Sequence, residues 1–316
     1  MRSIAYLFPG QGAQYVGMGK EFADLFAISR ETFEEADEWL GERLSKIIFE
    51  GPEEVLVQTK YSQLAIFVNS IAILRALLQQ MPDVRPLVCA GLSLGEYTAL
   101  CASGRLTFQQ TLLLVKERAQ FMNQACEQIP GTMAAVLGLN ALEVEQGVAG
   151  IAGVWVANYN CPGQTVISGT KEGVEKGSAA LKAKGAKRVL PLTVHGAFHS
   201  GLMRPAQEAL APLIAAAPIQ ESPVGLVMNV PGDFVQAIAE VKRFLTSQVT
   251  ESVRWEQGIG AMERKEIALY IEIGCGKTLT AMNKKIGVKG ISLSIERPSD
   301  FEPLAKQIEG CASCSC

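Results

Sequence analysis

Histidine is scarce in this chain, because its 316 residues include only His195 and His199. That scarcity argues against a histidine-rich metal centre and leaves two candidates for any histidine base. A strong net charge is also lacking: the formal value is -3 at pH 7, which gives no electrostatic case for binding nucleic acid or an anionic membrane. Motif-like sequence begins at Ile4, leaving no room for a signal or transit peptide, so we expect a cytoplasmic protein.

Long uninterrupted hydrophobic runs are missing as well. The most apolar stretch, residues 61–78, contains Gln63, Asn69 and Arg75, so we expect a buried core helix and not a membrane span. The eight cysteines are scattered, and most lie in apolar segments, which is typical of small core residues in a reducing compartment. The terminal group lacks a second pair of ligands, so an oxidation-prone tail is favoured over a metal site; it comprises Cys311, Cys314 and Cys316.

A glycine–serine motif follows a short apolar run. Residues 87–90 are typical of a strand, Gly91-Leu92-Ser93-Leu94-Gly95 comes next, and residues 96–102 are compatible with a helix. Strand, sharp turn and helix form the nucleophile-elbow pattern, in which glycines at 91 and 95 avoid clashes and the serine hydroxyl is exposed at a helix N-terminus. An ordinary turn with a capping serine is the alternative, and the motif alone is weak in a chain with 30 glycines.

The hydrophobic content of 48% supports a sizeable core, and helices alternating with short apolar strands indicate a mostly parallel, covered sheet. Residues 131–194 differ, because they read strand, helix, strand, turn, strand, helix, strand, which is the ferredoxin-like split pattern. We interpret 131–194 as an inserted small domain and 1–130 with 195–316 as the large domain. Expected strands outside the insert span 4–8, 87–90, 224–229 and 267–273. Expected helices span 20–26, 30–40, 58–78, 96–102, 108–128, 204–216, 237–248 and 255–263, with one more ending at 285.

A serine nucleophile needs a base, and His195 and His199 both lie in a glycine-containing loop that follows the insert. Residue types alone do not choose between them. Residues 9–14 form either a plain loop or a loop of N–H donors beside the nucleophile, and no Gly-Lys-Ser/Thr follows that would make it a phosphate loop. Arg118 sits one residue off the apolar stripe of helix 108–128, so it is either a solvated charge or a group that reaches inward.

Several motifs occur in a fixed order along the chain: Phe8-Pro9-Gly10-Gln11-Gly12-Ala13-Gln14, Gly91-Leu92-Ser93-Leu94-Gly95-Glu96-Tyr97, Arg118, Asn160-Cys161-Pro162-Gly163-Gln164, Gly196-Ala197-Phe198-His199-Ser200 and Glu272-Ile273-Gly274-Cys275-Gly276. With them the chain resembles the malonyl-CoA:acyl carrier protein transacylases of fatty acid synthesis and the acyltransferase domains of polyketide synthases. The similarity runs from about Ile4 to Ile286. It implies an α/β-hydrolase-like large domain and a ferredoxin-like small one, in agreement with the pattern above.

The resemblance implies transfer of a malonyl group from malonyl-CoA to the phosphopantetheine thiol of acyl carrier protein, for fatty acid biosynthesis. Ser93 matches the serine that is acylated, and His199 matches the catalytic histidine, which leaves His195 as the spare. The backbone N–H groups of Gln11 and Leu94 match the oxyanion hole. Neither a bound cofactor nor a metal is expected, and malonyl-CoA enters as a substrate.

Further roles are implied in the same way. Arg118 matches the arginine that grips the free carboxylate of malonate, and the main-chain carbonyl of Gln248 matches the group that holds the histidine. Phe198 stands beside the base in a signature typical of malonyl selectivity. Lys284 and Lys285 match a basic position that would contact the acidic carrier protein, although a charge pair at a helix C-terminus is an equal alternative. We expect a monomer with no nucleic-acid or membrane partner.

Some positions depart from the family pattern. Leu92 stands where His or Gln is common before the serine, Ser252 and Cys275 stand where Pro is common, and His195 stands where a small residue is usual. These departures concern the loops, and no matched catalytic position is lost.

Two other functions compete with the transferase. An α/β-hydrolase esterase would share the elbow and would place an acid between serine and histidine, but Glu143 and Glu172 fall in the insert. A carrier-binding module without catalysis is the second alternative, and the presence of both Ser93 and His199 argues against it.

Overall fold

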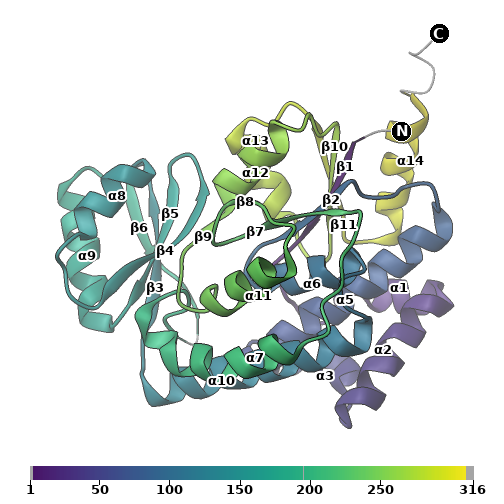
Figure 1. The fold of residues 1–316 in the computed structure, drawn as a ribbon, viewed down its shortest axis with the longest axis horizontal. Helices are drawn as coiled ribbons and strands as arrows, with labels where there is room; N and C mark the ends of the chain where they lie inside the picture. The colour runs from purple at the N-terminus through teal and green to yellow at the C-terminus, as the bar shows by residue number, and fades with distance from the viewer. Residues whose placement is uncertain (1–2, 195, 311–316) are drawn as a thin grey trace.

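The computed structural model describes residues 3–194 and 196–310, which are organised around two β-sheets (Figure 1). The first sheet has the strand order β11-β10-β1-β2-β7-β8. Its strands are β1 (Ile4–Phe8), β2 (Val88–Gly91), β7 (Gly225–Met228), β8 (Asp233–Phe234), β10 (Leu269–Ile273) and β11 (Ile291–Ile295). Every neighbouring pair from β11 to β7 is parallel, and only β8 pairs antiparallel. The predicted mostly parallel sheet is therefore confirmed.

The second sheet has the order β6-β3-β5-β4-β9. It contains β3 (Thr132–Leu137), β4 (Val154–Cys161), β5 (Gln164–Gly169), β6 (Arg188–Pro191) and β9 (Val253–Arg254). Helices α8 (Ala141–Val148) and α9 (Lys171–Ala183) pack against it at the left of Figure 1. The order β3-α8-β4-β5-α9-β6 is the split pattern expected for 131–194. The parallel pairing of β9 with β4 was not predicted, and it joins this sheet to a segment more than fifty residues beyond the insert.

The remaining helices surround the first sheet. They are α1 (Lys20–Leu25), α2 (Ala27–Leu40), α3 (Leu44–Glu50), α4 (Glu53–Leu56), α5 (Thr59–Gln80), α6 (Gly95–Ala102), α7 (Phe108–Gln128), α10 (Arg204–Ala216), α11 (Ile238–Ser247), α12 (Trp255–Glu263), α13 (Thr278–Ile286) and α14 (Phe301–Gly310), with 3-10 turns at Gly201–Met203 and Pro298–Asp300. Helix α5 is long and apolar enough to cross a membrane, but 83% of its most apolar window is buried in the protein. It packs against α2 and α7, as expected for a core helix.

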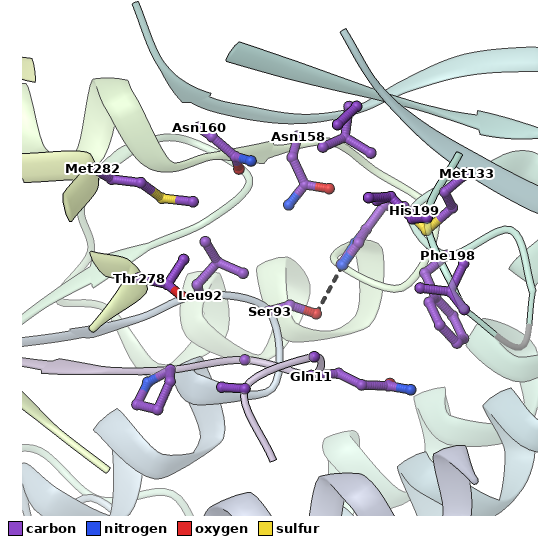
Figure 2. A pocket seen from close by; sticks show the side chains of 18 of the residues that line it. Gln11, Leu92, Ser93, Met133, Asn158, Asn160, Phe198, His199, Thr278 and Met282 are labelled. Atoms are coloured by element: carbon purple, nitrogen blue, oxygen red, sulfur yellow. Dashed lines mark hydrogen bonds between the residues drawn. The ribbon is translucent and has the colours of Figure 1, made fainter. Parts of the chain in front are cut away.

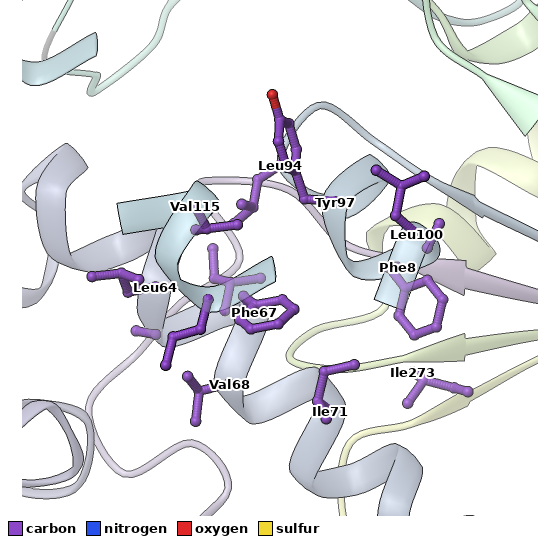
Figure 3. Packing of buried hydrophobic residues seen from close by; sticks show 14 of the residues in the cluster. Phe8, Leu64, Phe67, Val68, Ile71, Leu94, Tyr97, Leu100, Val115 and Ile273 are labelled. Carbon is purple, nitrogen blue, oxygen red and sulfur yellow. The ribbon is translucent and has the colours of Figure 1, made fainter. Parts of the chain in front are cut away.

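The core beneath the serine motif is closely packed. Leu94, Tyr97 and Leu100 of the elbow segment are fully buried and belong to one cluster with Phe67 and Phe8, and Figure 3 shows Leu94 above Phe67 of α5. Each such side chain stabilises the fold by about 1.5–3 kcal/mol through burial. Helix α6 is thus anchored by contacts with both the sheet and α5, which hold its N-terminus and the serine in place.

Several element boundaries differ from the predictions. The strand expected at 187–194 is limited to Arg188–Pro191, and β11, α3, α4 and α14 were not predicted. The hairpin turn is confirmed, because only Pro162 and Gly163 separate β4 from β5 and Gly163 has a φ of 74°. Four of the cysteines are buried, as expected for core residues: Cys89, Cys126, Cys161 and Cys275. The three cysteines of the tail lie outside the described residues.

Candidate active site

The serine lies in a tight turn that glycines permit. Ser93 follows the end of β2 and has a φ of 54°, a left-handed conformation that is uncommon for a non-glycine residue and costs on the order of 1–3 kcal/mol. A Cβ atom on Gly91 would lie 1.9 Å from the backbone of Gly95, and one on Gly95 would lie 2.2 Å from the carbonyl oxygen of Phe8. Both positions therefore accept only glycine, and the sharp strand–turn–helix geometry is present.

His199 is the histidine that the structure places at the serine. Its Nε2 lies 2.8 Å from Ser93 Oγ (Figure 2), and its Nδ1 lies 2.8 Å from the backbone oxygen of Gln248. The carbonyl oxygen can only accept, so the proton sits on Nδ1 and Nε2 is left to accept the serine hydroxyl. Burial, together with the charge of Arg118, lowers the pKa of His199 to about 4. The ring is therefore a neutral base at neutral pH. His195, the spare candidate, lies outside the described residues.

A buried carboxylate lies beneath this pair. Glu96 is fully buried in the first turn of α6; its Oε1 accepts the backbone N–H of Asn229 at 2.7 Å, and its Oε2 accepts from Gln248 Nε2. Gln248 Nε2 also donates to the backbone oxygen of Ser93 at 2.9 Å. Burial raises the pKa of Glu96, and the two N–H donors and the nearby Arg118 guanidinium oppose that rise.

The side chain of Asn229 holds the strained turn at Ser93 through two hydrogen bonds. It follows β7, and its Oδ1 accepts the backbone N–H of Ser93 at 2.7 Å while its Nδ2 donates to the backbone oxygen of Gly91 at 2.7 Å. One amide side chain thus bridges both sides of the elbow. The left-handed conformation of Ser93 persists because its surroundings determine it.

Arg118 is buried and points at the nucleophile. Only 1% of its surface is exposed, so the solvated-charge alternative is wrong. Its Nη2 lies 3.3 Å from Ser93 Oγ and 2.9 Å from Gln248 Oε1, and its Nη1 donates to Gln63 Oε1. The guanidinium also lies over the Tyr97 ring, with 5.2 Å from Cζ to the ring centroid. Its Nε has no hydrogen-bond partner within the described residues. Burial lowers the pKa of this arginine, yet a guanidinium stays protonated in proteins.

A pocket of about 400 Å³ opens over Ser93 and His199. Its walls come from the second sheet and from the segments that follow β1 and β2, and Figure 2 shows Asn158 and Asn160 of β4 on the side opposite Ser93. The pocket is also lined by Phe198, which is 6% exposed. Neither Arg118 nor Gln248 lines the open volume, although both contact Ser93. The space has the size of a small-molecule site, and its lining combines apolar side chains with polar ones that include the nucleophile and the base.

Two backbone N–H groups close to Ser93 in the sequence or the fold lack an acceptor among the described residues. A Cβ on Gly10 would lie 2.4 Å from the backbone oxygen of Leu92, so a glycine there brings the loop of residues 9–14 against the elbow. Gln11 follows in that loop and lines the pocket, and Leu94 follows the serine. Within the described part of the chain, neither Gln11 N–H nor Leu94 N–H has a hydrogen-bond acceptor.

The two lysines at the end of α13 differ in position. Both are exposed in its last turn. Lys285 lies one turn beyond Met282, and its Nζ is 3.5 Å from Oε1 of Gln164; Met282 and Gln164 both line the pocket. Lys284 has no such contact among the described residues.

The acids considered for an esterase triad lie elsewhere. Glu143 caps α8 through the N–H of Asn140 at 2.8 Å, and Glu172 pairs with Lys176 at 2.6 Å on α9. Neither contacts His199, whose Nδ1 is held by a carbonyl. The site is a serine–histidine dyad with a buried cation, which suits acyl transfer to and from a serine oxygen.

The sequence analysis missed Glu96, Asn229 and Gln63. One signal existed for Asn229, since it ends a predicted strand, and polar residues at the carboxyl ends of parallel strands lie at ligand sites. No pattern pointed to Gln63, which is one of many buried positions of α5.

Comparisons with known proteins identify one family. A family model described as the acyl transferase domain matches residues 5–292. The malonyl CoA-acyl carrier protein transacylase of Bacillus subtilis is 40% identical over 306 residues, covering 96% of each chain. The solved structure of the Clostridium perfringens malonyl CoA-acyl carrier protein transacylase has a TM-score of 0.93 at 36% identity, covering 99% of each chain. A malonyl-transacylase solved in complex with a type II polyketide synthase acyl carrier protein has a TM-score of 0.92 at 33% identity, covering 96% of this chain and 99% of that one.

Proposed function

The chain belongs to the malonyl CoA-acyl carrier protein transacylases of the acyl transferase family, and we propose that it moves a malonyl group from coenzyme A to acyl carrier protein through an ester on Ser93. The product supplies fatty acid synthesis, or polyketide synthesis where the carrier belongs to that pathway. The observation that carries the proposal is one juxtaposition. Ser93 Oγ lies 2.8 Å from a neutral histidine and 3.3 Å from a buried guanidinium.

The first half-reaction acylates the serine. His199 Nε2 takes the hydroxyl proton as Ser93 Oγ attacks the thioester carbonyl of malonyl-CoA. The C–S bond then breaks, and the departing coenzyme A thiolate takes the proton from Nε2. Because Nδ1 donates to the Gln248 carbonyl, the imidazolium formed on the way is held in place.

The second half-reaction reverses these roles. The phosphopantetheine thiol of the carrier gives its proton to His199 and attacks the malonyl ester, and Ser93 Oγ leaves with that proton. The N–H groups of Gln11 and Leu94 hold the oxyanion in both halves, and each such donor is typically worth about 2.7–4 kcal/mol. A thiol has to compete with water here, so a pocket wall that excludes water favours transfer over hydrolysis.

Arg118 is assigned to the malonyl carboxylate. A guanidinium offers a charge-assisted, two-pronged fit to a carboxylate, and this one is buried where its field is little screened. Phe198 is assigned to acyl-unit selectivity, because its ring fills the pocket wall next to the base. A methyl branch on the acyl group would meet that ring.

Of the two lysines, Lys285 suits contact with an acidic carrier better, because it is exposed and contacts Gln164, which lines the pocket. Lys285→Glu should raise the KM for carrier protein more than Lys284→Glu, and acylation by malonyl-CoA should not change. A single exposed ion pair is worth about 0–1 kcal/mol, so the difference should be severalfold at low salt and should shrink with added salt. Equal effects of the two charge reversals on this KM would contradict a specific contact between Lys285 and the carrier protein.

The remaining assignments concern organisation. Residues 131–194 are proposed as an inserted ferredoxin-like domain and residues 1–130 with 195–316 as the catalytic domain; the change of sheet at β3 and after β6 supports this division. We also assign a cytoplasmic, monomeric protein that needs no cofactor. Size-exclusion chromatography with light scattering tests the monomer, and retention of transfer after chelation and desalting tests the lack of a cofactor.

The deciding experiment is intact-mass spectrometry after mixing with malonyl-CoA, followed by addition of carrier protein that bears phosphopantetheine. A malonyl adduct on Ser93 that disappears into the carrier supports the transferase. Rapid release of free malonate would indicate an esterase, and the absence of an adduct would indicate a binding module. Ser93→Ala is the control, because it removes the nucleophile and leaves the backbone of the elbow unchanged.

A further inference from the structure

Glu96 lies at the centre of a hydrogen-bond network that reaches both members of the dyad. One carboxylate oxygen accepts the backbone N–H of Asn229, and the side chain of Asn229 bridges Ser93 N–H and Gly91 C=O at 2.7 Å each. The other oxygen accepts from Gln248 Nε2, and the backbone carbonyl of Gln248 accepts from His199 Nδ1 at 2.8 Å. The nucleophile and the base come from segments more than a hundred residues apart, and one side chain connects to each through a single intermediate residue.

We infer that Glu96 is a positioning residue of the acyl transfer, which sets the distance between Ser93 and His199 without touching the substrate. This inference rests on the proposed function. An acid in a serine triad usually contacts the histidine directly. Here the histidine contacts a carbonyl, and the acid acts one residue further away by holding the glutamine that carries this carbonyl.

The chemistry of the network favours an acceptor with two separate oxygens at position 96. Both contacts to Glu96 come from N–H groups, one on each oxygen, so each oxygen of this side chain acts as an acceptor. A glutamine of nearly the same volume offers one oxygen and one NH₂ group. In either orientation of that amide, an N–H donor of Asn229 or Gln248 would face another donor in a site with no exposed surface.

Glu96→Gln therefore should displace Gln248 or Asn229 with little change in packing. A shift of about 1 Å in reacting groups can cost on the order of 10²-fold in rate. We expect the rate of Ser93 acylation in single turnovers to fall about 10- to 100-fold. The KM for malonyl-CoA should change little, because Glu96 does not line the pocket.

A second readout follows the histidine itself and does not require activity. The chain contains two histidines. In a His195→Ala background with ¹⁵N-labelled histidine, the NMR spectrum therefore contains imidazole signals from His199 alone. In the parent protein His199 should show the Nδ1–H tautomer, with a protected proton donated to Gln248. Glu96→Gln should produce mixed tautomers and faster exchange of that proton.

The matched control is Glu272→Gln. Glu272 is also fully buried and also accepts two N–H groups, from Leu279 at 3.0 Å and Thr280 at 2.7 Å, but it does not contact the dyad network. It should lower the melting temperature without changing the His199 tautomer. If Glu96→Gln fails to fold, Gln248→Met interrupts the same network from the other side and should give the same tautomer change.

The outcomes are distinguishable. A parent-like tautomer and an acylation rate within about twofold of the parent would overturn the inference and leave the proposed function intact. Equal effects of Glu96→Gln and Glu272→Gln on tautomer and rate would also overturn it, because they would indicate a general packing defect. A parent protein that forms no malonyl-Ser93 adduct would instead refute the proposed function, and the tautomer measurement would still report on the network.

Discussion

Replacement of Arg118 by alanine should change which acyl group the protein accepts. Malonyl-CoA carries a carboxylate that acetyl-CoA lacks, and Arg118 is the buried cation whose Nη2 lies 3.3 Å from the nucleophile. Truncating one partner of a buried ion pair costs about 2–5 kcal/mol. At about 1.4 kcal/mol per factor of ten, kcat/KM for malonyl-CoA should fall roughly 30- to 4,000-fold. Acetyl-CoA makes no such pair, so its kcat/KM should not fall in parallel.

The same substitution should change the pH profile. The charge of Arg118 is the second cause, after burial, of the lowered pKa of His199. The parent enzyme should therefore keep its acylation rate from neutral pH down to about pH 5 and lose it near pH 4. Without the cation, protonation of His199 becomes easier, so the acidic limb of the profile should move to higher pH.

The assay is single-turnover acylation with both acyl-CoAs, measured by intact mass across this pH range. Arg118→Lys tests geometry, because it keeps the charge and loses the planar fork. Arg105→Ala is the matched control, since Arg105 is 3% exposed but donates to the backbone oxygen of Val224, away from the dyad. An unchanged ratio of malonyl to acetyl transfer in Arg118→Ala would refute the assignment and would require another carboxylate-binding group.

Other substitutions test the base, the pocket wall and the elbow. Burial lowers the pKa of His199 from 6.5 to about 4, so the unfolded chain binds a proton at a higher pH than the folded protein does. The free energy of unfolding should therefore fall by up to about 3 kcal/mol as the pH drops from 6.5 to 4, since each unit of pKa shift corresponds to about 1.36 kcal/mol. His199→Gln should remove that fall in denaturant titrations. Phe198→Ala should raise the ratio of methylmalonyl to malonyl transfer, by up to roughly 10- to 200-fold in competition assays if the ring alone excludes the methyl group. Gly91→Ala should prevent formation of the elbow, because its Cβ would lie 1.9 Å from backbone atoms, whereas Gly260→Ala has open space and should fold normally by circular dichroism.

Much of the fold could be predicted from local patterns. The hydrophobic runs located β1, β2 and β10, and the apolar stripe of α7 at Leu112, Val115, Ala119 and Met122 is buried as predicted. The elbow was recognisable because its steric requirement is local. Strand β9 was not, because its two residues form a strand only by pairing with β4, about a hundred residues earlier. Strand β6 is shorter than predicted: its register with β3 ends at Pro191, and only one further hydrogen bond, from Leu192 N–H to the backbone oxygen of Met133, continues the pairing.

For the site, the sequence by itself determined the tight turn at Ser93, the two candidate histidines and the ordered motifs of the family. Only the tertiary structure decided that the side chain of Arg118 is buried. A residue one position away from the apolar stripe of a helix can point either to solvent or to the interior. Only the tertiary structure revealed the network around Glu96, whose partners Asn229 and Gln248 are more than 130 residues away in the chain. A steric restriction within a few residues can be read from sequence, whereas a hydrogen bond between distant segments depends on how the whole chain packs.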